Sequence, residues 1–549
     1  MNLANLGLSG INAAQNRLQT TGHNINNAAT EGYNRQSVLV STAGATPTGF
    51  GFIGRGVQTD SVERAYNNFL SRQLVNSQST GASISAYGNE IVQINNLFAD
   101  RTVGITPALQ KFFDGIQAVA SSPADPAGRQ ELLGRSASLV GQLNDANAFL
   151  DAQRNNINTQ VSTVVTQVNS YVERIRDLNH QVVVAKASSS GQPPNDLLDQ
   201  RDQAVSELSQ LVGVRVLEQD GSVNLTLSNG QVLLGGDTVF PLQAVPAAND
   251  PTRTVVAYSA STGAGSTTLV EMDDSSISGG TLGGLLSYRN TTLDSVQNEL
   301  GRLAVGVALS VNKQHQAGFD QNGNAGAEFF SIGNPKALSS IDNKGSATVT
   351  ASFSDANALT GQDYKITFNG ANDYTVTSVP NGTQVFRGDL STPQEIGGMQ
   401  IQVAAGAQAG DSWALQPTRS AAGDLKLNLT DPASIAAAGS AIGDADGGNA
   451  LLLAKLQTEK VLGNGTMGLN EAFSQIVNKV GVQTQQNGTS AKAQATLIQQ
   501  NYAAQQAVAG VNLNEEYVNL DRSLEQFRAA SRLIDVSSTL FDTLLGMRA

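Results

Sequence analysis

Apolar residues recur at steps of three and four at both ends of the chain. The N-terminal stripe consists of Ala4, Leu8, Ile11, Gln15, Leu18, Gly22 and Ile25. The C-terminal stripe consists of Tyr517, Leu520, Leu524, Phe527, Ser531, Ile534, Ser538, Phe541 and Leu545. This spacing predicts a helix at each end, with one face that packs against another helix. Because neither end has room for a second such helix, the two faces are expected to meet each other or copies of themselves.

The large apolar members of these stripes are the candidate assembly residues. They are Leu8, Ile11, Leu18, Ile25, Leu520, Leu524, Phe527, Ile534, Phe541 and Leu545. Ordinary core packing is the alternative interpretation of any single stripe. Small or polar residues interrupt both stripes, and isolated helices of this length are marginal in water. We therefore expect the ends, residues 1–62 and 500–549, to be poorly ordered in the monomer and to fold when neighbouring subunits cover them.

Helical periodicity also marks the interior of the chain. The predicted helices run from near residue 62 to 98, from 157 to 182, from 197 to 211 and from 282 to about 316. The stripe over 157–182 is rich in β-branched residues and is followed by a Ser-, Gly- and Pro-rich loop, which is typical of a bundle or coiled-coil helix.

Two stretches alternate in the manner of β-strands. The first spans 214–281, where Asp220-Gly221 and Asn229-Gly230 favour tight hairpin turns. The second spans 319–429, and its clearest piece is a pair of alternating runs within 364–379, around Asn369-Gly370. Both stretches lie between helical segments, so each is expected to be an inserted β domain.

The order helix, β, helix, β, helix predicts a multidomain α+β fold. An elongated helical bundle or coiled coil is built from N-terminal, central and C-terminal segments, with two mainly-β domains inserted into it. The bundle is assigned to 63–213, 282–318 and 430–499, and the inserted domains are 214–281 and 319–429.

Composition narrows the class of protein. A chain of 549 residues is too long for one core. Its net charge of −13 argues against nucleic acid or an anionic membrane as a partner. With no cysteine, it has no disulfides, thiol nucleophiles or cysteine zinc sites. The first residues lack a basic start and an apolar run, so no cleaved signal peptide is expected, and no segment is apolar enough to predict a membrane helix.

Candidate chemistry is sparse. His23, His180 and His315 each fall in a predicted helix without a second ligand at metal-binding spacing. The run from Asp320 resembles the first half of a calcium loop, but Ser331 stands where the closing acidic residue belongs. We expect no enzyme, and we assign no catalytic, cofactor-binding or metal-binding residues.

Several sequence blocks resemble the flagellar rod, hook and hook-associated proteins. The N-terminal signature of that family matches residues 24–36, a helix end in an Asn-rich turn followed by Gly-Tyr, and its motif residues are Asn24, Asn26, Asn27, Gly32 and Tyr33. Residues 510–516 and 540–545 are similar to the C-terminal signature, and 196–213 and 318–326 to interior blocks of hook-associated members. Glu31 departs from the family pattern, which often has proline there.

This resemblance implies a structural protein of the bacterial flagellum, at the junction between hook and filament. The family assembles helically through terminal coiled-coil helices and is exported, without a cleaved signal, through the flagellum's own type III channel to the extracellular structure. The implied partners are copies of the chain, the hook protein, the second hook–filament junction protein and an export chaperone that binds the C-terminal helix. Two alternatives stay open: another axial protein such as the hook protein, and a secreted adhesin or glycan-binding protein that uses the β insertions.

Overall fold

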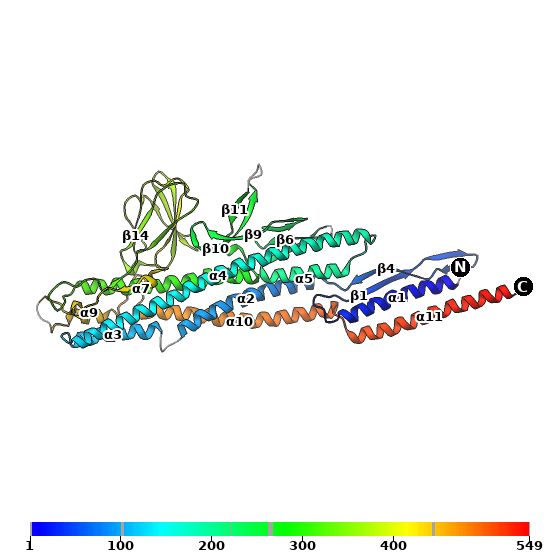
Figure 1. The fold of residues 1–549 in the computed structure, drawn as a ribbon, viewed down its shortest axis with the longest axis horizontal. Helices are drawn as coiled ribbons and strands as arrows, with labels where there is room; N and C mark the ends of the chain where they lie inside the picture. The colour runs from blue at the N-terminus through cyan, green and yellow to red at the C-terminus, as the bar shows by residue number, and fades with distance from the viewer. Residues whose placement is uncertain (1–2, 100–103, 220, 262–266, 442–444, 548–549) are drawn as a thin grey trace.

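The molecule is a long helical body with β regions along one side (Figure 1). The structure, a computed structural model, describes residues 3–99, 104–219, 221–261, 267–441 and 445–547. The 63 residues of α4 (Pro126–Ser188) form its longest helix, which is about 95 Å at 1.5 Å per residue. The predicted elongated α+β architecture is therefore confirmed.

Helices from three parts of the chain form the bundle. They are α2 (Asn68–Ala99), α3 (Ile105–Ser121), α4, α5 (Asn195–Leu211), α6 (Gly280–Tyr288), α7 (Asp294–Gln316), α9 (Gly448–Lys455) and α10 (Leu469–Ala509). A π-helical turn, η2 (Arg289–Leu293), joins α6 to α7. The helices predicted over 157–182, 197–211 and 282–316 are confirmed, whereas α3 and the first half of α4 had no prediction.

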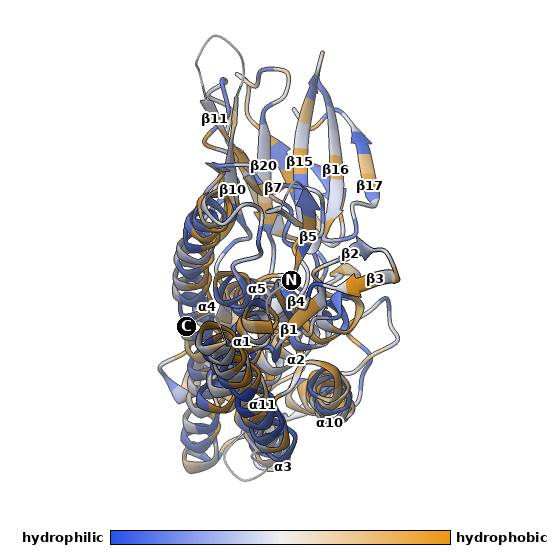
Figure 2. Ribbon diagram, turned by 90° about the vertical axis from the view of Figure 1, so that its right-hand side faces the viewer, coloured by the Kyte–Doolittle hydropathy of each residue, from blue (hydrophilic) through white to orange (hydrophobic). Residues whose placement is uncertain are grey.

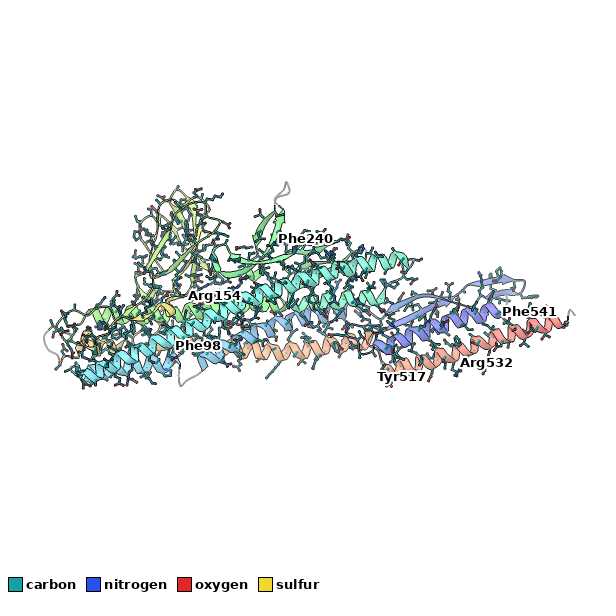
Figure 3. The ribbon with its side chains drawn as sticks, in the orientation of Figure 1. Phe98, Arg154, Phe240, Tyr517, Arg532 and Phe541 are labelled. Atoms are coloured by element: carbon teal, nitrogen blue, oxygen red, sulfur yellow. The ribbon has the colours of Figure 1, made fainter. Side chains whose placement is uncertain are left out.

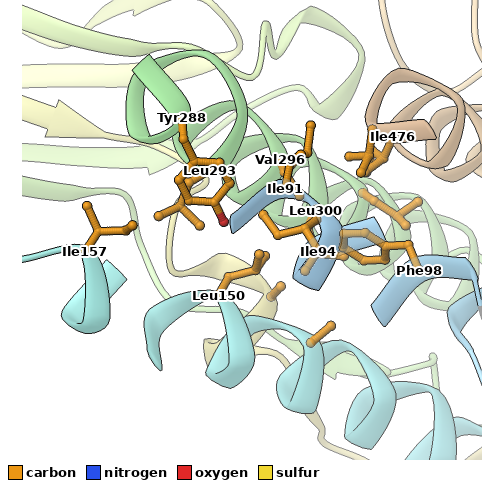
Figure 4. Close-up of a cluster of buried hydrophobic side chains, with 14 of the residues drawn as sticks. Ile91, Ile94, Phe98, Leu150, Ile157, Tyr288, Leu293, Val296, Leu300 and Ile476 are labelled. Atoms are coloured by element: carbon orange, nitrogen blue, oxygen red, sulfur yellow. The ribbon is translucent and has the colours of Figure 1, made fainter. Parts of the chain in front are cut away.

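The apolar stripes predicted in the interior of the chain lie in the core of the bundle. Ile157, Val161 and Val168 on α4 are fully buried, as the β-branched stripe predicted. They belong to one apolar cluster with residues of α2, α3, α7 and α10, part of which Figure 4 shows around Ile94, Leu150 and Leu300. At α4's start the Asp125 side chain accepts hydrogen bonds from two backbone amides, which stabilises its first turn.

The prediction of a helix from near residue 62 is wrong at its start. Residues 57–64 form a strand, β4 (Val57–Arg64), which pairs antiparallel with β1 (Gln36–Thr42). Helix α2 begins only at Asn68, where the Asn67 side chain accepts hydrogen bonds from the amides of Phe69 and Leu70. In 57–64 the backbone finds its hydrogen bonds in a strand partner 15 to 28 residues upstream, which helical periodicity does not report.

The strands of 214–281 lie directly on the bundle. One sheet contains β5 (Val214–Gln219), β6 (Ser222–Leu227), β7 (Val232–Gly235) and β8 (Thr238–Val239); the other contains β9 (Leu242–Ala247), β10 (Asp250–Ser261) and β11 (Thr267–Glu271). Their buried residues, such as Leu225 and Val256, join the same apolar cluster as the helices. The expectation of a separate β domain is therefore wrong, because these strands have no core of their own.

The second β insertion does have its own core. A five-stranded sheet is made of β13 (Lys336–Ser339), β15 (Asp363–Gly370), β16 (Asp373–Val379), β17 (Gln384–Gly388) and β20 (Ser412–Gln416). A three-stranded sheet is made of β14 (Val349–Phe353), β18 (Gln394–Ile396) and β19 (Met399–Val403). Ile366 and Trp413 of the first sheet share one cluster with Ile401 of the second. We call these residues, 336–416, the outer domain.

Two details of the prediction for 319–429 need correction. Phe329 and Phe330 belong to the bundle core, and β12 (Phe330–Ser331) pairs with β21 (Lys426–Leu427), so the outer domain is narrower than expected. The turn between β15 and β16 lies at Ala371-Asn372, which both have positive φ, rather than at Asn369-Gly370. Asparagine tolerates this left-handed conformation.

A buried cluster of alternating charges joins the outer domain to the bundle. Asp294, the first residue of α7, pairs with Arg154 of α4 at 2.9 Å and with Arg253 of β10 at 2.7 Å. Arg419 reaches Asp294 at 3.8 Å and also pairs with Asp363 of β15. Burial by itself would raise the pKa of Asp294, but the three arginine charges outweigh it and hold that pKa far below its usual range.

The two ends of the chain form a third region, the terminal unit. It consists of α1 (Leu3–Asn27), β1, β2 (Ala45–Thr48), β3 (Gly51–Gly54), β4 and α11 (Leu513–Gly546). It continues the long axis of the bundle, and both termini lie at its far end (Figure 1). The predicted boundary at residue 500 is displaced, because α10 runs without a break from Leu469 to Ala509. The break falls at Gly510 instead.

Candidate assembly surface

The two terminal helices lie antiparallel against each other, along a seam of small residues. A Cβ atom added at Gly7 would come within 2.7 Å of Ile534 Cγ1 and 2.9 Å of the Ala530 carbonyl oxygen. One added at Gly10 would lie 3.0 Å from the Ala530 Cβ. The helices therefore approach closely only because glycine and alanine line this contact.

Polar pairs continue the seam toward the bundle. Arg17 Nη1 donates to Gln526 Oε1 at 2.8 Å, and Asn24 Nδ2 donates to Glu516 Oε2 at 3.1 Å. The buried residues of α1 and α11 are accordingly small or polar: Gly7, Ala13, Ala14, Thr21, Asn24, Glu516, Ser523, Ala530 and Ser537. Little apolar area is removed from water in this seam.

A second side of α1 faces the β1–β4 ladder. The amide of Val57 donates to Ser9 Oγ at 3.3 Å, and Asn16 Nδ2 donates to Thr59 Oγ1 at 3.0 Å. Ser9 and Asn16 are seven residues apart and therefore share one side of the helix. Helix α1 is thus held between α11 on one side and a strand on another.

The predicted stripes lie only partly in the seam, where Ile534 packs against Gly7. Ile11, Leu18, Ile25, Leu520, Phe527 and Ile534 are half-buried. Leu8, Leu524, Phe541 and Leu545 are 52, 37, 61 and 53% exposed. Tyr517 at the start of α11 is also 53% exposed, and Figure 3 labels it together with Phe541 near the other end of the helix. The exposed members therefore do not form the contact between the two ends of the chain, and their packing against copies of the chain, the other expectation, stays a prediction.

We define the apolar face as eight of the large, exposed or half-buried residues of the two helices: Leu8, Ile11, Leu18 and Ile25 of α1 with Tyr517, Leu524, Phe541 and Leu545 of α11. It lies on the remaining side of α1, which contacts neither the ladder nor the centre of the seam. Its distal end extends past α1, because Gly7 lies opposite Ile534 in the antiparallel pair. Residues 541–547 of α11 therefore project beyond the first described residue of α1.

The family N-terminal motif builds the joint between the terminal unit and the bundle. Asn24, 1% exposed, uses its whole amide: it donates to Gln36 O and Glu516, and it accepts from the Tyr33 hydroxyl at 2.7 Å and from Gln36 N at 2.9 Å. Burial and nearby carboxylates raise the pKa of Tyr33, so its hydroxyl keeps the proton that it donates. Asn24 thus ties α1, β1 and α11 together.

The other motif residues differ in their roles. Gly32 has a φ of +78°, and a Cβ there would meet the side chain of Gln203 at 2.9–3.0 Å, so only glycine fits this turn. The Asn27 side chain donates to the carbonyl of His23 at the end of α1. Asn26 is exposed.

The joint also brings together two blocks that lie far apart in the sequence, 24–36 and 196–203. Asn34 donates to both carboxylate oxygens of Asp199, from its backbone at 3.0 Å and from its side chain at 2.6 Å. Arg64 pairs at 2.8 Å with Asp199 and with Asp202. Helical and strand periodicity does not mark Arg64 or Asn34 as residues of this joint. The only indication in the sequence is that both blocks, 24–36 and 196–203, resemble the same family.

We expect Asn24→Ala to loosen the joint without affecting the bundle. Four hydrogen bonds are lost. Each buried polar partner that is left unsatisfied lowers the free energy of unfolding by about 1–3 kcal/mol. In assembled subunits, where the terminal unit is ordered, hydrogen exchange should therefore speed up in 24–36 and 510–516 and remain unchanged in α4. Asn26→Ala is the matched control, and equal exchange in the two variants would contradict this role of Asn24.

The residues singled out for chemistry have structural roles. His315 is fully buried: its Nδ1 lies 2.7 Å from Ala327 O, and its Nε2 accepts from Ala436 N. The carboxylate of Asp320 accepts from the amides of Asn322 and Asn324, as in an Asx turn. Across the described residues, no three His, Cys, Asp or Glu side chains gather as metal ligands would. Within the same residues, no helix combines the length and apolar character needed to cross a bilayer.

Comparisons with known proteins agree with this geometry. Residues 91–330 match the family model described as the flagellar hook-associated protein FlgK helical domain, and residues 338–417 match the flagellar hook-associated protein 1 D2-like domain. Flagellar hook-associated protein 1 of Salmonella typhimurium is 38% identical over 555 residues, and that of Escherichia coli K12 is 36% identical over 549 residues; each alignment covers 100% of both chains.

A solved structure gives the same picture. The flagellar hook junction protein FlgK from Burkholderia pseudomallei superposes with a TM-score of 0.73 at 30% identity, covering 80% of this chain and 100% of that one. With full-length identity above 30% and family domains matched in the bundle and the outer domain, the chain belongs to the flagellar hook-associated protein 1 family.

Proposed function

We propose that this structural protein of the flagellum takes its place at the hook–filament junction by burying its apolar face against neighbouring subunits. The observation that carries the proposal is an inversion of the usual packing. Inside its own seam the terminal unit buries glycine, alanine, serine and polar residues, while it leaves Leu8, Phe541 and Leu545 more than half exposed. Monomeric proteins rarely expose such a continuous apolar surface.

Burial of this face would supply the driving force of assembly. A fully buried leucine or phenylalanine contributes roughly 1.5–3 kcal/mol. The face holds eight large side chains, so the gain survives a substantial entropic cost of ordering the ends. In the free chain we propose that the terminal unit is poorly ordered, because none of the large side chains of α1 and α11 belongs to either apolar core cluster.

The neighbours of this surface follow from the family. We propose contacts with copies of the chain, with the hook protein and with the second junction protein, and export to the cell exterior without a cleaved signal. The full-length relatives favour this function over a hook protein or an adhesin. Before export, a chaperone would cover the same face of α11; unchanged chaperone affinity of a Leu524→Asp, Phe541→Asp chain would refute that part.

Removal of the terminal unit tests the proposal. Both apolar clusters lie entirely within 68–509, from Ala86 to Val480. A chain of residues 68–509 should therefore unfold thermally at the same temperature as the main transition of the full chain, yet fail to enter flagella. Its detection at the junction of motile cells would overturn the proposed function.

A further inference from the structure

A second apolar feature of the terminal unit is exposed, without a partner among the residues that the structure describes. Strands β2 and β3 form a two-stranded hairpin whose residues are all exposed. Phe50, Phe52 and Ile53 are 105, 79 and 54% exposed. Figure 2 shows the hairpin standing out from the helices, with β3 in the orange of hydrophobic residues. We call residues 43–56 the hairpin arm.

The arm is anchored at its base and free at its tip. The amide of Ala43 donates to Gly56 O, and that of Arg55 donates to Gly44 O, so the ladder closes at the base. A Cβ at Gly56 would meet Ser9 of α1, whereas Cβ atoms at Gly49, Gly51 and Gly54 would meet nothing within 4 Å. The tip therefore contributes no burial to the fold of its own chain.

The arm and the apolar face point in different directions at the same level of the molecule. The arm's base touches α1 at Ser9, and the distal part of α11 crosses α1 at Gly7. Ser9 and Ile11 point about 160° apart around α1, since each residue advances by 100°. One side of the terminal unit thus carries an apolar projection, and nearly the opposite side carries an apolar surface.

Charge matches the two surfaces as well. Arg55 is the only charged residue in 43–56. Among the described residues of distal α11, 532–547, the charged ones are Arg532, Asp535 and Asp542, which leaves a net charge of −1. Asp535 and Asp542 are seven residues, about two helical turns, apart and therefore lie on one side of the helix. A positive arm and a negative distal α11 attract each other between copies.

We propose that the hairpin arm of one subunit packs on the distal end of the apolar face of a second copy of this chain. This inference rests on the proposed function and names the element that covers the face. Two different surfaces of each copy then meet, which is a heterologous contact. Such a contact repeats from subunit to subunit and forms a ring or a helix. Phe50, Phe52 and Ile53 meet the end of the face at Phe541 and Leu545, and Arg55 faces Asp535 and Asp542.

Disulfide cross-linking tests this pairing in the assembled state, because the chain has no cysteine of its own. Full-length Phe52→Cys and Leu545→Cys chains are produced in the same cells, and their flagella are isolated and oxidised. We expect a mixed dimer whose linked peptides contain positions 52 and 545. The dimer should be lost when Ile341→Cys, 73% exposed on the outer domain side, replaces Phe52→Cys.

A second pair separates failure of this inference from failure of the proposed function. Leu8→Cys and Leu545→Cys chains report whether the apolar face meets another copy at all. If they link while position 52 does not, or if position 52 links to a different axial protein, the arm pairing is overturned and the assembly face stands. If neither pair links, the arm pairing is overturned; if a Leu8→Asp chain also enters flagella normally, the proposed function is overturned as well.

Discussion

The double substitution Leu524→Asp, Phe541→Asp is expected to abolish assembly and leave the bundle folded. Both side chains are exposed in the free chain, so two new carboxylates cost little there. In the assembly they would be buried without partners, at several kcal/mol per charge, and their apolar contribution of roughly 1.5–3 kcal/mol each is lost as well. Swimming on soft agar and immunodetection of the protein in isolated flagella measure the result.

The matched control is a pair of exposed apolar residues outside the terminal unit. Val184 on α4 and Ile341 in the outer domain are 53 and 73% exposed. Aspartate at these two positions should leave motility intact, and all variants should keep the thermal transition of the parent chain. Normal incorporation of the Leu524→Asp, Phe541→Asp chain would contradict the proposed role of the apolar face.

The second large effect concerns the buried charge cluster. Asp294→Asn leaves Arg154, Arg253 and Arg419 without their shared carboxylate while preserving its shape. Loss of one partner from a buried ionic group typically costs about 3–5 kcal/mol. We expect urea unfolding to report a loss of this size in the bundle and a looser attachment of the outer domain.

A surface pair provides the comparison for this substitution. Arg387 and Asp373 pair at 2.9 Å in the outer domain, with Arg387 61% exposed. Because solvent screens such a pair, Asp373→Asn should leave unfolding unchanged. Equal effects of the Asp294 and Asp373 substitutions would show that burial of the cluster contributes nothing.

The pH dependence of stability distinguishes the Asp294→Asn chain from the parent chain. The folded-state pKa of Asp294 is depressed below that of the unfolded chain, which is about 4. The contribution of Asp294 to stability is therefore fully present above pH 4 and is lost as the pH falls below it. The Asp294→Asn chain should accordingly lose less stability than the parent between pH 5 and pH 2.

The parts of the fold that sequence predicts are those in which burial follows a local period. On α4, Val161, Val164 and Val168 recur at helical spacing and are buried together. The strand after Gly221 alternates between half-buried and buried residues, and Gly221 and Gly230 both have the positive φ that their turns need. In these segments each residue's environment is set by neighbours three, four or two positions away.

Local periodicity does not predict the terminal seam. Its centre consists of Gly7, Ala14, Ser523 and Ala530, which carry no hydrophobic signal although they determine how closely the helices approach. Only some of the large stripe residues, namely Leu8, Leu524, Phe541 and Leu545, mark the surface that the seam leaves exposed. The joint was also hidden, because Asn34 and Asp199 are 165 residues apart and become partners only in the folded chain.

Hydroxyl-radical footprinting of the full chain, free and in isolated flagella, tests the central claim most directly. The account predicts that Leu524, Phe541 and Leu545 are oxidised readily in the free protein and lose that labelling in flagella, while Ile341 is oxidised in both. Equal oxidation of the three residues in both states would contradict it.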